Sequence, residues 1–388
     1  MISISLPDAH RKLETYRLIG EPLPVPSKPR RFNRVAFSAA HVVADPLSAL
    51  EPSVGPAIDW KATIAYRRYL LGLGLGIAES MDTAQRGMGL DWNGALELIR
   101  RTLEETRDIP NALIYSGCGT DQLNPADARS VDDVLRAYDS QLSSIQKLGG
   151  RIILMASRAL VRVAGGPEDY ARVYQTVLSQ CDHPVILHWL GEMFDPALDG
   201  YWGARSFDQA LDTCLRVIRD NAAKVDGIKI SLLDKDKEIR MRRLLPSTVK
   251  MYTGDDFNYP ELIAGDSQGY SHALLGIFDA IAPAASAALG ALTDGDQQRF
   301  LSLLEPTVPL SRLIFRAPTQ FYKTGVVFLA YLNGHQDHFV MVGGAQAMRP
   351  LPYFIDLFRL ADQASLLRDP AVAAARMRAF LALYGVVD

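Results

Sequence analysis

The sequence predicts an α/β protein built on a (β/α)8 barrel, with an N-terminal arm and a C-terminal helical extension. Two observations carry this prediction. Short apolar runs typical of buried strands alternate eight times with amphipathic helical patterns between residues 34 and 290. Eight parallel strands joined by crossover helices close naturally into a barrel. Second, residues 291–388 have mostly helical patterns and lie outside the alternation.

The expected elements follow from local pattern and from the residues at their ends. The strands are short apolar runs bounded by glycine, proline or polar residues, and they cover residues 34–40, 74–79, 112–116, 151–155, 184–189, 225–233, 249–253 and 269–276. The helices have apolar residues at helical spacing, and they cover residues 59–73, 91–106, 131–148, 167–180, 206–223, 235–245 and 259–264. Asp59 is the expected N-cap of the first helix. Residues 1–33 form a polar arm that ends in a proline-rich stretch, residues 21–26, and resembles a cover or linker.

The composition is that of an ordinary soluble globular protein, with 48% hydrophobic and 22% charged residues in a chain of 388. A formal net charge of -3 gives no reason to expect nucleic acid or an anionic membrane as a partner. Three widely spaced cysteines indicate neither a disulfide framework nor a metal pattern, so a cytoplasmic location is expected. Residues 1–20 contain no apolar signal-peptide core. The apolar run 273–292 includes Asp279 and Pro283, which favours a buried strand-to-helix passage over a membrane span.

One strand carries a lysine among apolar residues. In the run 225–233, alternation places Ile228, Ile230 and Leu232 on one face and Gly227, Lys229 and Ser231 on the other. A small-charged-small face leaves space around the amine. Burial without a counter-charge lowers a lysine pKa and makes the neutral amine available to attack a carbonyl. The alternative is a structural ion pair with a carboxylate at the strand end.

In a barrel of this type the chemistry lies at the C-terminal ends of the strands. Many of the residues that follow the expected strands can bind or transfer protons. In strand order they are His41; Glu79, Asp82 and Thr83; Cys118, Thr120 and Asp121; Ser157, Arg158 and Arg162; His188 and Glu192; Lys229 and Ser231; and Asp255 and Asp256.

Three segments in the same order resemble the dihydrodipicolinate synthase / N-acetylneuraminate lyase family of class I aldolases. Asp226-Gly227-Ile228-Lys229 is similar to the family's I-G-I-K on the sixth strand. Pro184-Val185-Ile186-Leu187-His188 is similar to its P-x-I-L-Y on the fifth strand, and Gly254-Asp255-Asp256 to its G-D-D after the seventh. The resemblance covers roughly residues 34–285 and implies a (β/α)8 barrel with a Schiff-base lysine at Lys229.

The departures from the family concern the groups that hold pyruvate. His188 stands in place of the family's catalytic tyrosine, and Glu192 and Asp195 stand where the family has an arginine. Residues 79–84 replace the loop G-T-T-G-E that binds the ketoacid carboxylate. The chain therefore resembles a divergent dihydrodipicolinate synthase-like branch whose substrate differs from plain pyruvate.

These observations give each candidate residue an expected role. Lys229 forms the Schiff base, and His188 relays protons because an unperturbed imidazole has a pKa near 6.5. Asp82, Thr83, Asp255 and Asp256 contact substrate hydroxyls or a carboxylate, Arg158 binds a carboxylate or phosphate, and His41 belongs to the site because it ends the first strand. Three alternatives stay open: Asp255 or Asp256 caps the next helix, Arg158 lies in a solvated loop, and His188 is only packed.

No cofactor is expected. The glycines of Gly72-Leu73-Gly74-Leu75-Gly76 follow a helix and precede a strand, the reverse of the order that a dinucleotide-binding turn requires. The pair His335 and His338 has no third metal ligand nearby in the sequence.

The sequence thus predicts a lyase of the class I aldolase type, acting on a small keto or aldehyde compound that is sugar-derived or a hydroxylated keto acid. A homo-oligomer, dimer or tetramer, is expected, with no nucleic-acid or membrane partner. One alternative is a metal-dependent barrel enzyme that uses His41, Glu79, His188 and Asp255. The other is a non-catalytic barrel that binds a sugar acid.

Overall fold

The computed structural model describes residues 2–8, 10–25 and 29–387. Eight parallel strands close into a barrel in the order β10-β3-β4-β5-β6-β7-β8-β9, which confirms the predicted fold class. The strands are β3 Ala36–Ala39, β4 Gly76–Glu79, β5 Ile114–Cys118, β6 Arg151–Leu154, β7 Val185–Leu190, β8 Val225–Ser231, β9 Lys250–Thr253 and β10 His272–Leu275. The lysine strand β8 is therefore the sixth of the barrel, as the sequence predicts.

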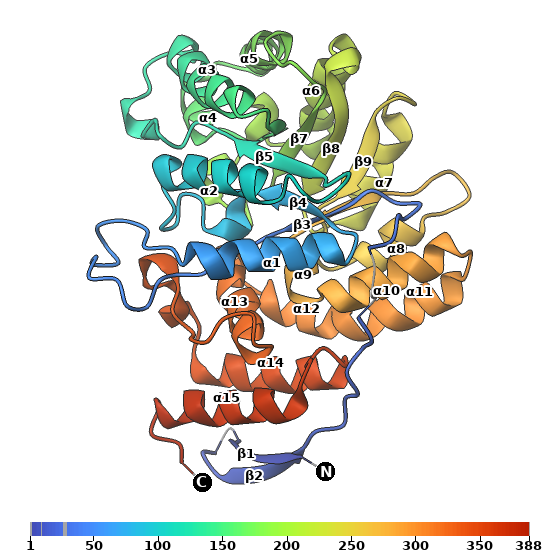
Figure 1. Cartoon of the computed structure of the whole chain (residues 1–388). Helices are drawn as coiled ribbons and strands as arrows, with labels where there is room; N and C mark the ends of the chain where they lie inside the picture. The colour runs from blue at the N-terminus through green and yellow to red at the C-terminus, as the bar shows by residue number, and fades with distance from the viewer. Residues whose placement is uncertain (1, 9, 26–28, 388) are drawn as a thin grey trace.

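Helices surround the barrel between consecutive strands (Figure 1). They are α1 Trp60–Gly72, α2 Trp92–Glu105, α3 Val131–Lys147, α4 Arg158–Val163, α5 Pro167–Ser179, α6 Phe207–Asp220, α7 Lys235–Leu244, α8 Tyr259–Ala264, α9 Ile277–Ala280 and α10 Ala282–Thr293. Asp59 caps α1, because its side chain accepts a hydrogen bond from the Ala62 N–H at 3.0 Å. The apolar run 273–292 passes from β10 through α9 into α10 and is almost wholly buried, as expected.

The interior of the barrel is filled by alternate residues of its strands. Large side chains fill the barrel below the C-terminal ends of its strands: Phe37, Tyr115, Ile153, Ile186, Tyr252 and Leu274. Glycines accommodate them, since a Cβ on Gly227 would lie 2.5 Å from the Tyr252 ring. The interior is thus closed below, and space remains only toward the C-terminal ends of the strands.

The C-terminal extension is a helical layer against one side of the barrel (Figure 1). It comprises α11 Gln297–Leu304, α12 Val308–Ile314, α13 Tyr322–Leu332, α14 Leu351–Gln363 and α15 Pro370–Ala382. Aromatic rings pack together in its centre, with Phe328 4.7 Å from both Phe354 and Phe380 between ring centroids. Such edge-on and tilted contacts stabilise a core beyond area burial alone.

The N-terminal arm contains structure that the sequence prediction missed. Strands β1 Ser3–Pro7 and β2 Leu13–Arg17 form an antiparallel hairpin beside α15, at the far end of the extension from the barrel (Figure 1). Asp362 of α14 holds it, accepting hydrogen bonds from the Tyr16 hydroxyl at 2.8 Å and the Ile19 N–H at 2.9 Å. Residues 1, 9 and 26–28 of the predicted arm lie outside the described residues, including the end of its proline-rich stretch.

One helix of the extension reaches the barrel mouth. Helix α13 packs against α9, which directly follows the last barrel strand. At its start, Tyr322 shares a hydrogen bond of 2.7 Å with Thr83, in the loop after β4. The extension therefore contributes to the region where the chemistry of a barrel enzyme is expected. Within the described ranges, no helix is long and apolar enough to cross a membrane.

Candidate active site

Lys229 and His188 lie side by side inside the barrel. Strands β7 and β8 pair in parallel, and the register places His188 opposite Lys229. His188 follows the inward-facing Ile186 by two residues, so both site residues point into the interior. His188 is 1% exposed and Lys229 is 7% exposed. The His188 Nε2 lies 3.2 Å from the hydroxyl of Ser231, which follows Lys229 by two residues on the same face of β8.

The Lys229 amine is buried and makes no direct contact with a counter-charge among the described residues. In the described part of the chain it forms no ion pair or hydrogen bond, so the arrangement differs from a structural strand-end pair. Burial lowers the pKa of Lys229, because the charged form loses its hydration, and the negative charges of Asp256 and Asp82 offset this only in part. A lowered pKa raises the fraction of the neutral, nucleophilic amine at a given pH.

Asp256 is a buried carboxyl group beside this amine. It is 4% exposed, and burial raises its pKa to about 7, while Lys229 acts in the opposite direction. One carboxyl oxygen accepts a hydrogen bond of 2.9 Å from the Ile277 N–H, which fixes the side chain. Burial thus moves both members of the pair toward their neutral forms, a free amine and a protonated acid.

His188 differs from the expectation of an imidazole that titrates near pH 6.5. Burial and the positive charge of Lys229 lower its pKa well below 6.5. The imidazole is therefore neutral at physiological pH, with one nitrogen near Ser231. The other, Nδ1, has no hydrogen-bond partner among the described residues.

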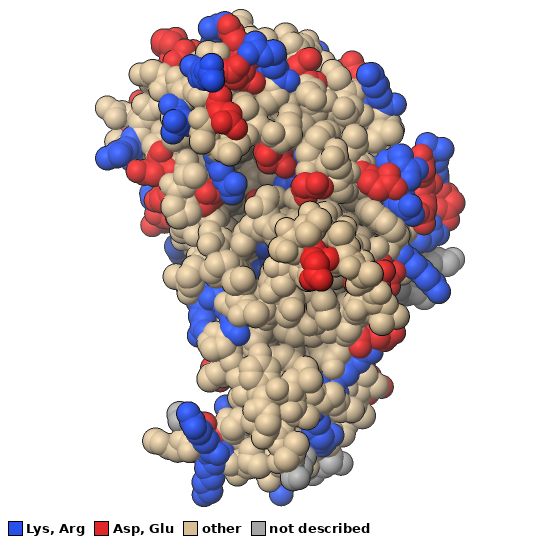
Figure 2. All heavy atoms as spheres, turned by 90° about the vertical axis from the view of Figure 1, so that its left-hand side faces the viewer, with Lys and Arg blue, Asp and Glu red and all other residues tan. Residues whose placement is uncertain are grey.

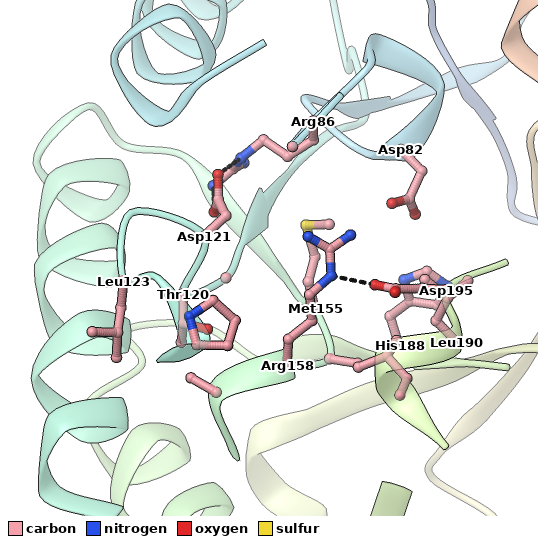
Figure 3. A pocket seen from close by; sticks show the side chains of 16 residues that line it. Asp82, Arg86, Thr120, Asp121, Leu123, Met155, Arg158, His188, Leu190 and Asp195 are labelled. Atoms are coloured by element: carbon pink, nitrogen blue, oxygen red, sulfur yellow. Dashed lines mark hydrogen bonds and ion pairs between the residues drawn. The ribbon is translucent and has the colours of Figure 1, made fainter. Parts of the chain in front are cut away.

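A pocket opens above His188, whereas Lys229 and Asp256 lie deeper and are not among its lining residues (Figure 3). The loops after β4, β5, β6 and β7 line it, and His188 lies at its base. Asp82, Arg158 and Asp195 surround the space above His188 (Figure 3). Arg158 and Asp195 form an ion pair, so this arginine is held at the pocket rather than free in solvent.

The opposite wall contains a second ion pair that the sequence analysis missed. Arg86 is buried and binds Asp121 at 2.6 Å (Figure 3). It also donates to the Gln141 side-chain oxygen at 2.7 Å. It joins the loop after β4 to the loop after β5. Seen from the side of the pocket loops, charged residues of both signs gather over the upper half of the molecule, whereas the lower half is mostly uncharged (Figure 2).

Other predicted site residues make contacts outside the pocket. The Thr83 hydroxyl is bonded to Tyr322. Asp255 accepts hydrogen bonds from the Phe257 N–H at 2.8 Å and the Asn258 amide at 2.8 Å, the capping role that the sequence left open. His41 is completely buried against Asp279, with Nδ1 2.9 Å from the carboxylate, and does not line the pocket.

The four residues of the metal alternative do not converge. Glu79 points outward from the barrel and forms a fully buried ion pair of 2.9 Å with Arg67 of α1. His41 is bound by Asp279, and Asp255 caps the turn before α8. Within residues 2–8, 10–25 and 29–387, no three His, Cys, Asp or Glu side chains are grouped closely enough to hold a metal ion.

Lys323, directly after Tyr322, is a second buried amine that the sequence analysis did not single out. It is 4% exposed, and burial lowers its pKa to about 8, with Asp82 partly opposing this shift. The sequence contains only a weak indication that Lys323 is buried. It is the one charged residue in α13, a helix whose residues are otherwise apolar or neutral.

Comparisons with known proteins agree with the fold. The family model described as "Protein of unknown function (DUF993)" matches residues 4–386. No curated protein matches. A crystal structure of a putative dihydrodipicolinate synthetase from Pseudomonas aeruginosa is 17% identical with a TM-score of 0.62, over 85% of this chain and 99% of that chain.

Two further solved structures are equally distant in sequence. The dihydrodipicolinate synthase from Oceanobacillus iheyensis is 18% identical with a TM-score of 0.62, over 85% of this chain and 95% of that one. The chloride-inhibited dihydrodipicolinate synthase from Acinetobacter baumannii complexed with pyruvate is 17% identical with a TM-score of 0.63, over 86% and 99%. The chain belongs to the DUF993 family of unknown function, and its barrel has the fold of the dihydrodipicolinate synthases.

Proposed function

We propose that the protein is a lyase of the class I aldolase type, in which Lys229 forms a Schiff base with a keto or aldehyde substrate. The observation that carries this proposal is the buried, unpaired amine of Lys229 beside Asp256, whose pKa is about 7. Imine formation needs a neutral amine to attack and an acid to release water. Lys229 on β8 and Asp256 in the loop after the neighbouring strand β9 are the groups proposed for these two roles.

The first step joins the substrate to the protein. The Lys229 Nζ attacks the carbonyl carbon, and a carbon–nitrogen bond forms as the carbon–oxygen π bond breaks. One proton passes from the nitrogen to the oxygen, which becomes the hydroxyl group of a neutral carbinolamine. Protonated Asp256 then gives its proton to this hydroxyl, which leaves as water, and a positively charged iminium group remains. The Asp256 carboxylate produced in this way stabilises that charge.

The second step breaks a bond next to the iminium carbon. The iminium group withdraws electrons, so that a carbon–carbon or carbon–oxygen bond at the neighbouring position can break and leave an enamine. For a carbon–carbon bond, a substrate hydroxyl must lose its proton, and the unpartnered Nδ1 of neutral His188 is the group proposed to take it. Reprotonation of the enamine and hydrolysis of the imine release the product and restore Lys229.

The pocket favours a hydroxylated substrate. Asp82 lies at the pocket with its carboxylate free to accept hydrogen bonds from hydroxyl groups (Figure 3). Arg158, paired with Asp195, is positioned for an anionic or hydroxyl group at the rim. We therefore propose a sugar-derived carbonyl compound or a hydroxylated keto acid. His41 and Asp255 have structural contacts instead, and the proposed mechanism gives them no substrate contact.

The experiment that tests this proposal is borohydride trapping followed by intact mass measurement and peptide mapping. The panel contains keto acids, keto sugars and sugar acids. Reduction of an imine adds the substrate mass to the protein, and the label is expected on the peptide that contains Lys229. Lys61→Met is the matched control, because Lys61 is an exposed lysine of α1 and its removal should leave the label in place.

Two results would contradict the aldolase reading. Trapping that persists in Lys229→Ala would place the imine elsewhere. Ligands that bind without trapping or turnover would instead support the non-catalytic barrel.

A further inference from the structure

Lys323 is a buried cation with no anionic partner in the described chain. Its amine lies 3.1 Å from the Gln320 carbonyl oxygen and 3.3 Å from the Met88 sulfur. The ring of Tyr322 is 4.8 Å away, measured from the amine to the ring centroid. None of these groups carries a negative charge, and no ion pair of Lys323 occurs within residues 2–8, 10–25 and 29–387.

The surrounding helix gives this amine a fixed position. Every residue of α13 is buried, and the Tyr322–Thr83 hydrogen bond holds the start of the helix against the turn at Asp82. Met88, in the same loop after β4, contacts the amine itself. The loop that forms one wall of the pocket therefore also encloses Lys323.

The charges that act on Lys323 belong to the pocket. They are those of Asp82, Arg158 and Asp195, and all three residues line it. Asp82 acts on Lys229 as well, so one carboxylate lies within electrostatic range of two buried amines.

Lys323 itself does not line the pocket but lies directly behind its wall. It contacts Met88, the neighbour of the pocket residue Gly87. It also follows Tyr322, which is bonded to Thr83 next to Asp82.

The cations that line the pocket are already neutralised. Arg158 is paired with Asp195, and Arg86 with Asp121. A buried ammonium without a counter-charge is unfavourable unless an anion joins it. Because Lys229 is the proposed nucleophile, Lys323 is the cation that remains for a charged group of the ligand.

We propose that Lys323 binds an anionic group of the substrate, a carboxylate or a phosphate, at the part of the molecule remote from its reacting carbonyl. The proposed function supplies only the carbonyl group of this substrate, and the inference rests on it to that extent. Together they narrow the substrate class to anionic carbonyl compounds. It also gives the C-terminal extension a part in specificity, through a residue that lies outside the barrel.

The test uses polyols that have no ketone or aldehyde and so cannot form an imine. Gluconate carries a carboxylate, glucitol 6-phosphate carries a phosphate, and glucitol is the neutral control. Each is titrated calorimetrically into the full-length wild-type protein and into Lys323→Met, Lys323→Arg and Lys61→Met. Lys61 is an exposed lysine of α1 and serves as the matched control for loss of one positive charge.

At least one anionic polyol is expected to bind the wild type and Lys61→Met equally. It should bind Lys323→Met at least tenfold more weakly, because a desolvated charge pair is lost. Lys323→Arg should retain part of the affinity, and glucitol should bind all four proteins alike. The polyol that shows the larger loss identifies carboxylate or phosphate as the preferred anion.

The inference is overturned if neither anion binds the wild type, or if a folded Lys323→Met, verified by its melting curve, binds them with unchanged affinity. It is also overturned if borohydride trapping labels Lys323, since the amine would then be a nucleophile. The same titration on Lys229→Ala separates the two proposals. Anion binding that Lys229→Ala retains would show that the anion site does not depend on the Lys229 amine. Anion binding by a wild-type protein that traps no carbonyl compound of the panel would contradict the aldolase function and leave the anion site standing.

Discussion

The Cα of Gly254 faces the side chain of Lys229 so closely that a methyl group there would lie 2.8 Å from the Lys229 Cε. The same methyl would lie 2.3 Å from the Ser231 hydroxyl and 2.6 Å from the Ile230 carbonyl oxygen. The residue directly after strand β9 thus lacks a side chain where strand β8 places its lysine. The glycine of Gly254-Asp255-Asp256 thereby creates the space that the amine occupies.

Gly254→Ala is expected to displace Lys229 and to reduce imine trapping at least tenfold. The contact involves backbone on one side, so the strain cannot be relieved by a side-chain rotation alone. Overpacking of this kind destabilises a protein by about 1–3 kcal/mol, which urea unfolding measures. Gly72→Ala is the control, because a Cβ on this last residue of α1 meets no atom within 4 Å. Normal trapping in Gly254→Ala would show that the lysine does not need this space.

The pH dependence of kcat/KM should identify the proton donor. If protonated Asp256 releases water from the carbinolamine, the rate falls as pH rises through its pKa of about 7. Asp256→Asn should remove this alkaline limb and slow the reaction. His188→Ala should lower the rate without changing the shape of the profile between pH 6 and 8, because the pKa of His188 lies well below 6.5. A limb that disappears in His188→Ala would transfer the proton donation to His188.

The stability of Lys323→Met relative to the wild type should depend on pH. The pKa of Lys323 is about 8 in the folded protein and near 10.5 in the unfolded chain, so the unfolded state binds more protons between these values. Wild-type stability therefore rises with pH across this window, relative to a variant that lacks the amine. At about 1.36 kcal/mol per pKa unit, the full change is on the order of 3 kcal/mol.

Lys323→Met should accordingly be more stable than the wild type at pH 7, and this advantage should shrink by pH 10. Urea unfolding at both pH values measures it, with Lys61→Met as the surface control. The charges that face the amine are those of Asp82, Arg158 and Asp195. An identical difference at pH 7 and pH 10 would mean that the Lys323 amine is not desolvated.

The barrel could be predicted from the sequence because its signals are local. Each strand is a short apolar run followed by an amphipathic helix, and the face parity of β8 follows from alternation within seven residues. The pairing of His188 with Lys229 then follows from the order of consecutive parallel strands. These features need no knowledge of contacts between distant segments.

The wall of the pocket could not be predicted in this way. Tyr322 and Lys323 lie more than two hundred residues after the Thr83 loop in the chain, and nothing in their local pattern reveals that they return to the barrel mouth. Equally, local position suggested a site role for His41, whereas its contacts with Asp279 depend on the turn into α9. A charged residue at the end of a strand can line the pocket, cap a turn or form an ion pair with a surrounding helix. Contacts between distant segments of the chain decide which of these it does.

The last prediction tests whether the extension shapes the pocket through Tyr322. Its hydroxyl shares a 2.7 Å hydrogen bond with Thr83, and both residues are buried. Tyr322→Phe leaves the Thr83 hydroxyl without this partner, which costs about 1–3 kcal/mol of stability. Because Thr83 follows Asp82 in the turn at the pocket, the loosened turn should raise KM more than it lowers kcat.

Tyr331→Phe is the matched control for this variant, since Tyr331 lies at the other end of α13. Its hydroxyl donates to the Arg376 carbonyl at 3.3 Å, within the extension. Removal of this hydroxyl should reduce stability slightly and leave KM unchanged. Equal effects of the two substitutions on KM would mean that α13 supports the fold as a whole, whereas an effect confined to Tyr322→Phe would assign the start of α13 to the substrate pocket.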